Sequence, residues 1–185
     1  MKNKSVLFAE NIENLFFPDK VIISGGILAI LSVTNSNLTL NNFATFLISL
    51  LVFHSTKKLL GKRINNEDKT YLSSSILATV IFFILSTVLQ VSDVIKFGAL
   101  SLFLNLILLF VIRDFWKISA HVSVYVNACT VLTLINKSFL ILFAFLPLVI
   151  WSRIKLKRHT YLQIVAGGFA GFLLSIIIKF LVEYI

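Results

Sequence analysis

Long apolar segments limit what this chain can fold into more than any other feature of its sequence. Hydrophobic residues make up 58% of its 185 residues and charged residues only 14%, whereas soluble domains contain about 45–50% apolar residues. A helix that crosses the hydrocarbon core of a bilayer needs about 20 consecutive apolar residues. The sequence predicts seven candidate spans: Val21–Thr34, Phe43–Leu60, Leu72–Val91, Ile95–Ile112, Ala120–Ile135, Ser138–Trp151 and Tyr161–Val182.

We therefore expect an all-α fold, a polytopic transmembrane bundle of six or seven helices that forms one integral membrane domain over residues 1–185. The choice between six and seven depends on the first span, because Gly25-Gly26 weakens its helix propensity. The spans lack the period-two alternation of a membrane barrel. Charged residues interrupt the first 19 positions and no cleavable-signal pattern follows them, so we expect the first span to remain in the mature protein.

The basic residues predict the orientation of the bundle. With seven helices, all of the 17 Lys and Arg residues except Lys96, Lys137 and Lys179 fall on one side, which the positive-inside rule assigns to the cytoplasm. The net charge of +9 lies in short loops between apolar stretches, a pattern that indicates anionic lipid headgroups and not nucleic acid. We expect membrane lipids as partners and the plasma (inner) membrane as the location. A homo-oligomer remains open.

Two polar clusters stand at the mouths of the fifth and seventh spans, and the single hairpin between them puts both on one face. They are Lys117-Ile118-Ser119-Ala120-His121 and Ser152-Arg153-x5-His159-Thr160. Unpaired amides at a helix start can hold a phosphate without a metal, and Lys117, Arg153 and Arg158 add positive charge. One histidine could attack phosphorus while the other protonates the leaving oxygen.

Metal and cofactor chemistry is not expected. The chain has one cysteine, Cys129, so neither a disulfide nor a Cys-based metal site can form within it. Its three histidines and scattered carboxylates show no tight ligand spacing such as His-Glu-x-x-His. Asp and Glu are also missing from the spans, which argues against an ion-coupled transporter.

The order Ser-x-His, then Ser-Arg-x5-His-Thr leading into a glycine-rich helix, resembles the second and third motifs of the type 2 phosphatidic acid phosphatase (lipid phosphate phosphatase) superfamily. The resemblance covers residues 113–171. It implies a metal-independent phosphatase with a phosphohistidine intermediate, in which His159 is the nucleophile and His121 the general acid. The implied phosphate-binding residues are Lys117, Ser119, Arg153, Ser152 and Arg158.

The departures from that family indicate a divergent member. Ala120 replaces the glycine of the second motif, and Gln163 stands where the family has a carboxylate that orients the nucleophile. The first motif is present only as a loose echo in residues 57–63, and the acidic residues of Glu67-Asp68-Lys69 occupy the position of a loop that replaces this motif in one subgroup.

Composition and motifs together predict a membrane hydrolase that acts on a lipid phosphate or diphosphate of the polyprenyl or diacylglycerol type. Two alternatives stay open: an inactive relative that binds phosphorylated lipid or supports a membrane complex, and a lipid phosphotransferase that uses the same site. Lys155 and Lys157 fit cations that snorkel to headgroups, and Gly167-x3-Gly171 fits close helix packing. Trp116 and Trp151 fit interfacial anchors.

Overall fold

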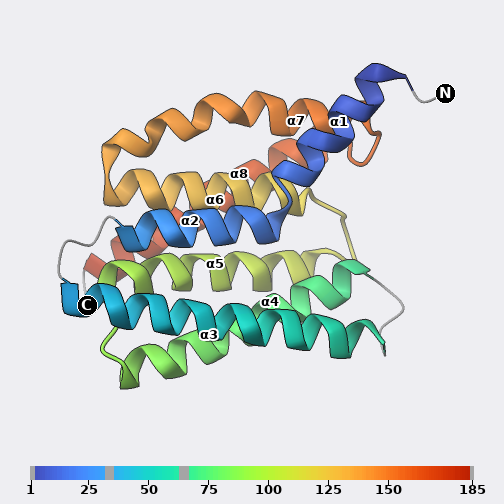
Figure 1. Ribbon diagram of the computed structural model, residues 1–185. Helices are drawn as coiled ribbons and strands as arrows, with labels where there is room; N and C mark the ends of the chain where they lie inside the picture. Colours follow the sequence, from blue (N-terminus) through green and yellow to red (C-terminus); the bar gives the residue numbers. More distant parts are fainter. Residues whose placement is uncertain (1–2, 32–35, 63–66, 184–185) are drawn as a thin grey trace.

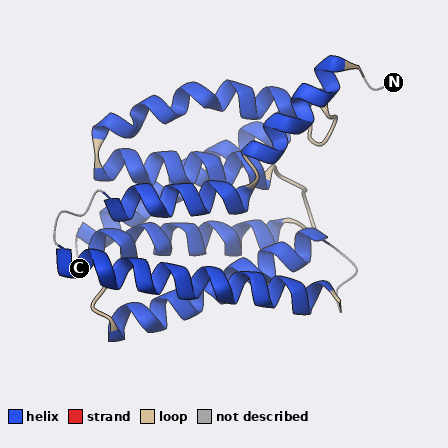
Figure 2. Ribbon diagram, in the orientation of Figure 1, coloured by secondary structure: helices blue, strands red, loops and turns tan. Residues whose placement is uncertain are grey.

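The computed structural model describes residues 3–31, 36–62 and 67–183, and every regular element within these ranges is helical (Figure 2). The predicted all-α bundle is therefore confirmed. In chain order (Figure 1), the elements are α1 (Lys4–Leu15), α2 (Pro18–Leu31), α3 (Ser36–Gly61), α4 (Glu67–Val88), α5 (Asp93–Ile112), α6 (Ala120–Ile135), the 3-10 helix η1 (Lys137–Phe145), α7 (Leu146–Lys155) and α8 (Tyr161–Glu183).

Five described segments are long and apolar enough to cross a membrane, as expected of an integral membrane protein. They are Leu40–Gly61, Lys69–Val88, Asp93–Ile112, Lys137–Lys155 and Tyr161–Leu181. The first and fifth predicted spans are instead the short helices α2, of 14 residues, and α6, of 16 residues. At 1.5 Å per residue α6 is about 24 Å long, less than a bilayer core of about 30 Å. The end of the first predicted span, residues 32–34, lies outside the described residues.

Two local features differ from the predicted pattern. The sixth span begins as the 3-10 helix η1 and becomes the α-helix α7 near Pro147. Proline has no N–H and clashes with the carbonyl four residues back, so a regular α-helix cannot continue upstream through it. The second difference is α1, which no apolar run predicted. Asn3 caps this helix, its side chain accepting from Ser5 N at 3.1 Å, and the buried Ala9 and Ile12 attach the helix to the bundle.

Helix α6 occupies the centre of the bundle. Ten of its 16 residues are buried, and it packs against α2, α5, α7, α8 and η1. Figure 1 shows α3 and α4 on one side of this centre and the η1–α7 segment on the other. The surroundings of α6 are thus mostly protein and not lipid, which explains why a helix too short to span can form the core.

Polar side chains join α6 to its neighbours inside the bundle. Asn127 Nδ2 donates to Ser101 Oγ of α5 at 2.8 Å and to Ser175 Oγ of α8 at 2.9 Å. One turn earlier, Ser123 Oγ donates to Asn105 Oδ1 at 2.8 Å. In a lipid environment, hydrogen bonds between helices contribute about 0.6–2 kcal/mol each. These contacts fix the rotation of α6 relative to α5 and α8.

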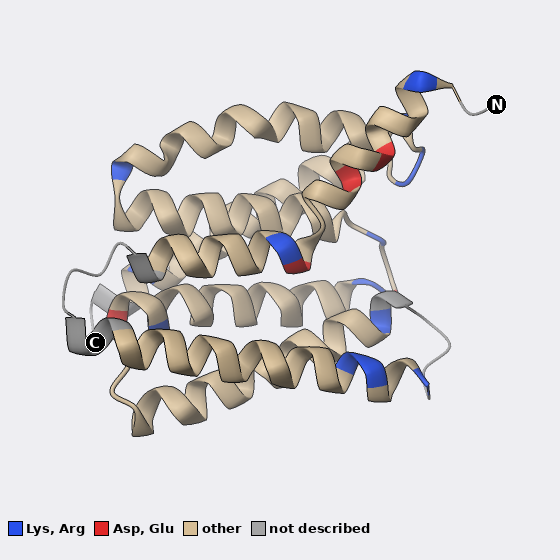
Figure 3. Cartoon of the chain, viewed as in Figure 1, with Lys and Arg blue, Asp and Glu red and all other residues tan. Residues whose placement is uncertain are grey.

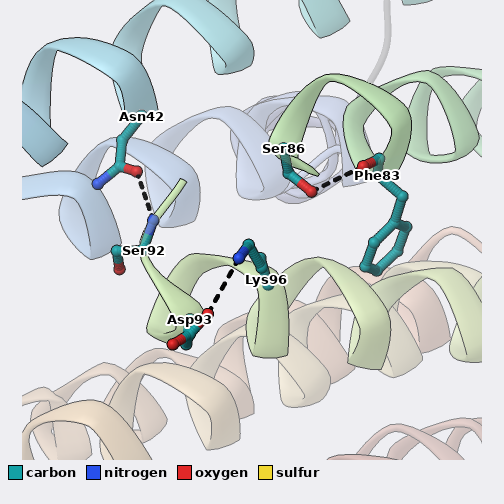
Figure 4. A network of polar contacts seen from close by, with 6 residues as sticks. All are labelled: Asn42, Phe83, Ser86, Ser92, Asp93 and Lys96. Atoms are coloured by element: carbon teal, nitrogen blue, oxygen red, sulfur yellow. Dashed lines mark hydrogen bonds and ion pairs between the residues drawn. The ribbon is translucent and has the colours of Figure 1, made fainter. Parts of the chain in front are cut away.

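A second polar group closes the far end of the bundle (Figure 4). Asn42, fully buried on α3, accepts from Ser92 N at 3.0 Å. Asp93 and Lys96 form an ion pair at 3.0 Å in the first turn of α5. The side chain of Asn42 therefore ties α3 to the turn between α4 and α5.

Lys and Arg residues gather at the opposite end. Figure 3 shows most of the Lys and Arg segments at the end where α6 begins and where α7 passes into α8, which is the one-sided distribution that the topology predicts. This end of the bundle also contains both polar clusters.

Replacing Asn127 by Leu should lower the free energy of unfolding by about 1–3 kcal/mol, because the change leaves Ser101 and Ser175 without their shared donor. Equilibrium unfolding in mixed detergent measures the loss. Thr130→Val is the matched control, since the buried Thr130 hydroxyl donates only to Val126 O of its own helix. Equal stability of both variants would contradict a linking role for Asn127.

Candidate functional site

The backbones of α6 and α8 touch where the two polar clusters meet. A Cβ atom on Gly167 would lie 2.6 Å from Ser119 O, and one on Gly171 would overlap Ser123 O. Ser119 N donates to Gln163 O at 3.0 Å, so the start of α6 is bonded directly to the first turn of α8. The prediction that Gly167-x3-Gly171 serves close helix packing is confirmed, and the two clusters do lie at one end of the bundle.

The start of α8 is closed by a capping box. Thr160 N donates to Gln163 Oε1 at 2.9 Å, and Gln163 N donates to Thr160 Oγ1 at 3.4 Å. Gln163, which stands where the resembling family has a carboxylate, thus caps a helix. It also lies within hydrogen-bonding reach of His159. Lys157, with a positive φ of 52°, turns the chain between α7 and α8. His159 follows this turn and directly precedes the capping residue Thr160.

His159 is partly buried beside cations. Burial lowers the pKa of His159 from its ordinary value of 6.5, and the positive charge of Arg153 lowers it further. Hydrogen bonds with the Lys117 backbone and the Gln163 side chain act in the opposite direction but do not reverse the shift. His159 is therefore neutral at physiological pH, the form in which an imidazole nitrogen can act as a nucleophile.

Ser119 and His121 stand at the start of α6. Ser119 is the N-cap residue and is fully buried, yet its side chain makes no capping hydrogen bond. His121 packs edge-on against Phe17 at 5.0 Å between ring centroids. Arg153, Arg158 and His159 all lie near His121. The two histidines and two arginines thus form one cluster.

Arg153 is almost completely buried near the end of α7, with only 2% of its side chain exposed, and forms an ion pair with Glu13 of α1. Glu13 Oε1 also lies 3.7 Å from Arg158 Nε in the loop after α7. Sequence reasoning missed Glu13. Its signal was present, because Glu13 follows Ala9 by one helical turn and so stands on the buried face of α1, where a carboxylate needs a cationic partner.

Polar atoms of the cluster are left without hydrogen bonds. Within the described residues, four buried atoms from the two predicted motifs have neither a hydrogen-bond nor an ion-pair partner: Ser119 Oγ, His121 Nε2, Arg153 Nε and His159 Nδ1, whereas Arg153 Nη2 pairs with Glu13. Each unsatisfied buried group costs about 1–3 kcal/mol. Four such groups close together, two at the start of α6 and two from the end of α7 and the loop that follows it, are the arrangement expected of a site for a small polar ligand, and the two arginines favour an anion.

The remaining predicted phosphate-binding residues take different positions. Ser152 is buried, and its hydroxyl donates to Val149 O within α7 at 2.8 Å, so it is engaged in the helix. Lys117 is exposed in the segment before α6, with its backbone against His159. Arg158 is 63% exposed. Both cations can therefore approach a ligand from the solvent side.

Lys57, in the loose echo of the first motif, lies over aromatic rings. Lys57 Nζ lies 5.7 Å from the ring centroids of Phe17 and Phe53, and Phe17 separates it from His121. Lys69 pairs with the exposed Asp114 at 3.1 Å. Residues 63–66 lie outside the described residues. Over the ranges that the structure describes, no group of three or more His, Cys, Asp or Glu could hold a metal ion.

An apolar cavity lies between α2, α3, α4, α5 and α6. Its empty volume, including the space at its open side, is about 1060 Å³. The lining begins at Asp19 and Phe53, next to the aromatic residues that border His121, and continues to Leu132 near the other end of α6. Phe17 lies between the two regions, because its ring packs against both His121 and Tyr71, and Tyr71 packs in turn against the cavity residue Phe53. The cavity thus runs from the end of the bundle that contains the cluster towards the far end.

In comparisons with known proteins, no family model matches this chain, and neither a curated protein nor a solved structure matches it. The functional argument therefore depends on the geometry of the site and on the motifs.

Replacing Gly171 by Ala should destabilise the protein by about 1–3 kcal/mol, because the added methyl group meets the Ser123 carbonyl and the two helices must separate. Gly168→Ala is the matched control: its Cβ would find ordinary contact with Val122 at 3.5 Å, so the higher helix propensity of Ala leaves stability equal or slightly raised. Thermal unfolding in detergent compares the two variants. A Gly171→Ala protein as stable as the wild type would contradict the close packing.

The pKa of the His159 imidazole should lie below the ordinary histidine value of 6.5, because burial and the Arg153 charge both disfavour the protonated ring. Nitrogen NMR of the protein with isotopically labelled histidine measures this titration, and the spectrum of His159→Ala assigns the signal. A midpoint above 6.5 would show that the ring is not held next to Arg153 in this way.

Proposed function

We propose that this protein is a metal-independent membrane phosphatase that hydrolyses the phosphate of a phosphorylated lipid through a phosphohistidine intermediate. The observation that carries the proposal is the group of four unpartnered buried polar atoms on Ser119, His121, Arg153 and His159. The same residues carry the resemblance to the type 2 phosphatidic acid phosphatase superfamily. Nucleophile, acid and anion-binding groups converge at one place, as a phosphoryl transfer site requires.

In the first step the substrate phosphate docks against Arg153, Ser119 and the free amides at the start of α6, with Lys117 and Arg158 approaching from the solvent. A neutral nitrogen of His159 attacks phosphorus and forms a P–N bond while the bond to the lipid oxygen breaks. His121 donates its proton to that leaving oxygen. The negative charge of the bound phosphate stabilises the protonated form of His121 before transfer.

In the second step a water molecule attacks the phosphohistidine. His121, now neutral, takes a proton from this water, the P–N bond breaks, and inorganic phosphate leaves with both histidines restored. Arg153 stabilises the negative charge on the phosphoryl oxygens in both steps. No metal is needed, because the arginines, the lysine and the helix amides supply the positive field.

The surroundings of the site favour a lipid substrate. The five long apolar helices belong in a bilayer, and the cations at the site end suit the negatively charged surface of the membrane. The apolar cavity begins at Phe53, which Tyr71 and Phe17 connect to His121, and its lining suits a hydrocarbon chain. A polyprenyl or diacylglycerol phosphate would place its headgroup among the cations and its chain along this cavity. By the positive-inside rule the site faces the cytoplasm, and the plasma membrane is the proposed location.

One observation favours a second candidate, a protein that binds phosphorylated lipid without turnover. Gln163 caps α8 at the position where the family has a carboxylate, so no negative charge from this residue stabilises a protonated His159. Transfer of the phosphoryl group to an acceptor other than water would use the same His159 intermediate. The nature of the released product distinguishes these candidates.

Phosphate release from lipid phosphates and diphosphates, measured on the purified protein in detergent with EDTA, tests the proposal. We expect EDTA-resistant release that falls by about 10²–10⁴-fold in His121→Ala and at least as far in His159→Ala, since one loses the acid and the other the nucleophile. His54→Ala is the matched control, because His54 is exposed on α3. Undiminished hydrolysis by folded His159→Ala would sink this mechanism, and absence of release from every lipid would favour the binding protein.

A further inference from the structure

Glu13 brings a negative charge to the proposed anion site. Its carboxylate is 84% shielded from solvent (16% exposed), pairs with the buried Arg153 and lies 3.7 Å from Arg158. Figure 3 shows acidic segments on α1 beside the end of α7, where the cations of the site gather. The carboxylate therefore neutralises part of the positive charge that a phosphate would use.

Packing holds this carboxylate in place. Phe8 packs against Trp151 at 5.8 Å between ring centroids, and Phe16 packs against Tyr125 at 5.3 Å. Between these two anchors the buried Ala9 and Ile12 face the bundle. Glu13 lies between Phe8 and Phe16 on a helix fixed at both ends, so it cannot simply move away when an anion binds.

A fixed negative charge acts more strongly on a more negative ligand. Coulomb energy is proportional to the product of the charges, so each additional charge on the ligand adds its own repulsion from Glu13. A diphosphate headgroup carries about one negative charge more than a monophosphate at neutral pH. Arg153, Arg158 and Lys117 attract the ligand, and Glu13 repels it. The repulsion that Glu13 adds is larger for the diphosphate than for the monophosphate.

We propose that Glu13 is a specificity-determining residue that biases the site towards a lipid monophosphate and against a lipid diphosphate. This inference rests on the proposed function, because it concerns the same anion site. Helix α1 lies outside the region that carries the phosphatase-like motifs. The inference gives this helix a part in selecting the substrate.

Calorimetric titration of the purified full chain in detergent with inorganic phosphate and with pyrophosphate tests the inference without requiring turnover. In Glu13→Gln we expect the ratio of pyrophosphate to phosphate affinity to rise roughly tenfold, the effect of removing one nearby charge in a partly buried site. Asp93→Asn is the matched control, because it removes the same charge from an ion pair with Lys96 at the far end of the bundle. Its ratio should stay at the wild-type value.

Hydrolysis supplies a second measurement of the same ratio. With a polyprenyl monophosphate and the corresponding diphosphate as substrates, kcat/KM should shift towards the diphosphate in Glu13→Gln. If both affinities fall together and the ratio is unchanged, Glu13 only holds Arg153 in position and the inference is overturned while the proposed function stands. If the wild type binds neither phosphate nor pyrophosphate, the anion site itself is absent and both proposals fail.

Discussion

The direct backbone contact between α6 and α8 is the constraint on which the site depends. Gly167 and Gly171 allow the carbonyls of Ser119 and Ser123 to approach α8 to a distance that any side chain would prevent. This contact brings the start of α6 beside the start of α8, so the residues of two motifs 38 positions apart, counted between His121 and His159, share one cluster. The hydrogen bonds of Asn127 to α5 and α8 then fix the rotation of α6.

The same region contains buried polar atoms of the two motifs that have no hydrogen-bond partner. Arg153 is buried against the carboxylate of Glu13, and Ser119, His121 and His159 each present a buried polar atom without a hydrogen bond. Such groups cost stability. An anion bound at the proposed site would offset this cost, so its affinity and the stability of the bundle would be linked. Glu13 supplies part of the negative charge around Arg153.

The sequence predicted most of the long helices, but it did not predict which side chains contact one another. The apolar segments predicted α3, α4, α5 and α8 because runs of about 20 apolar residues have few structural alternatives in a membrane. It missed α1, whose mixed charged and apolar residues resemble a soluble loop when counted by composition alone. It also did not indicate that the Ser152 hydroxyl donates to Val149 O. Both cases depend on which face of a helix is covered, a property set by neighbouring helices.

By itself, the sequence determined an all-α membrane bundle, the helix-mouth position of His121 and His159, and the gathering of cations at one end, because hydrophobic length and loop charge act locally along the chain. Only the tertiary structure decided that Glu13 reaches Arg153 and that an apolar cavity lies between α2, α3, α4, α5 and α6. These arrangements join residues far apart in the chain. Their outcome depends on packing geometry, which no local pattern encodes.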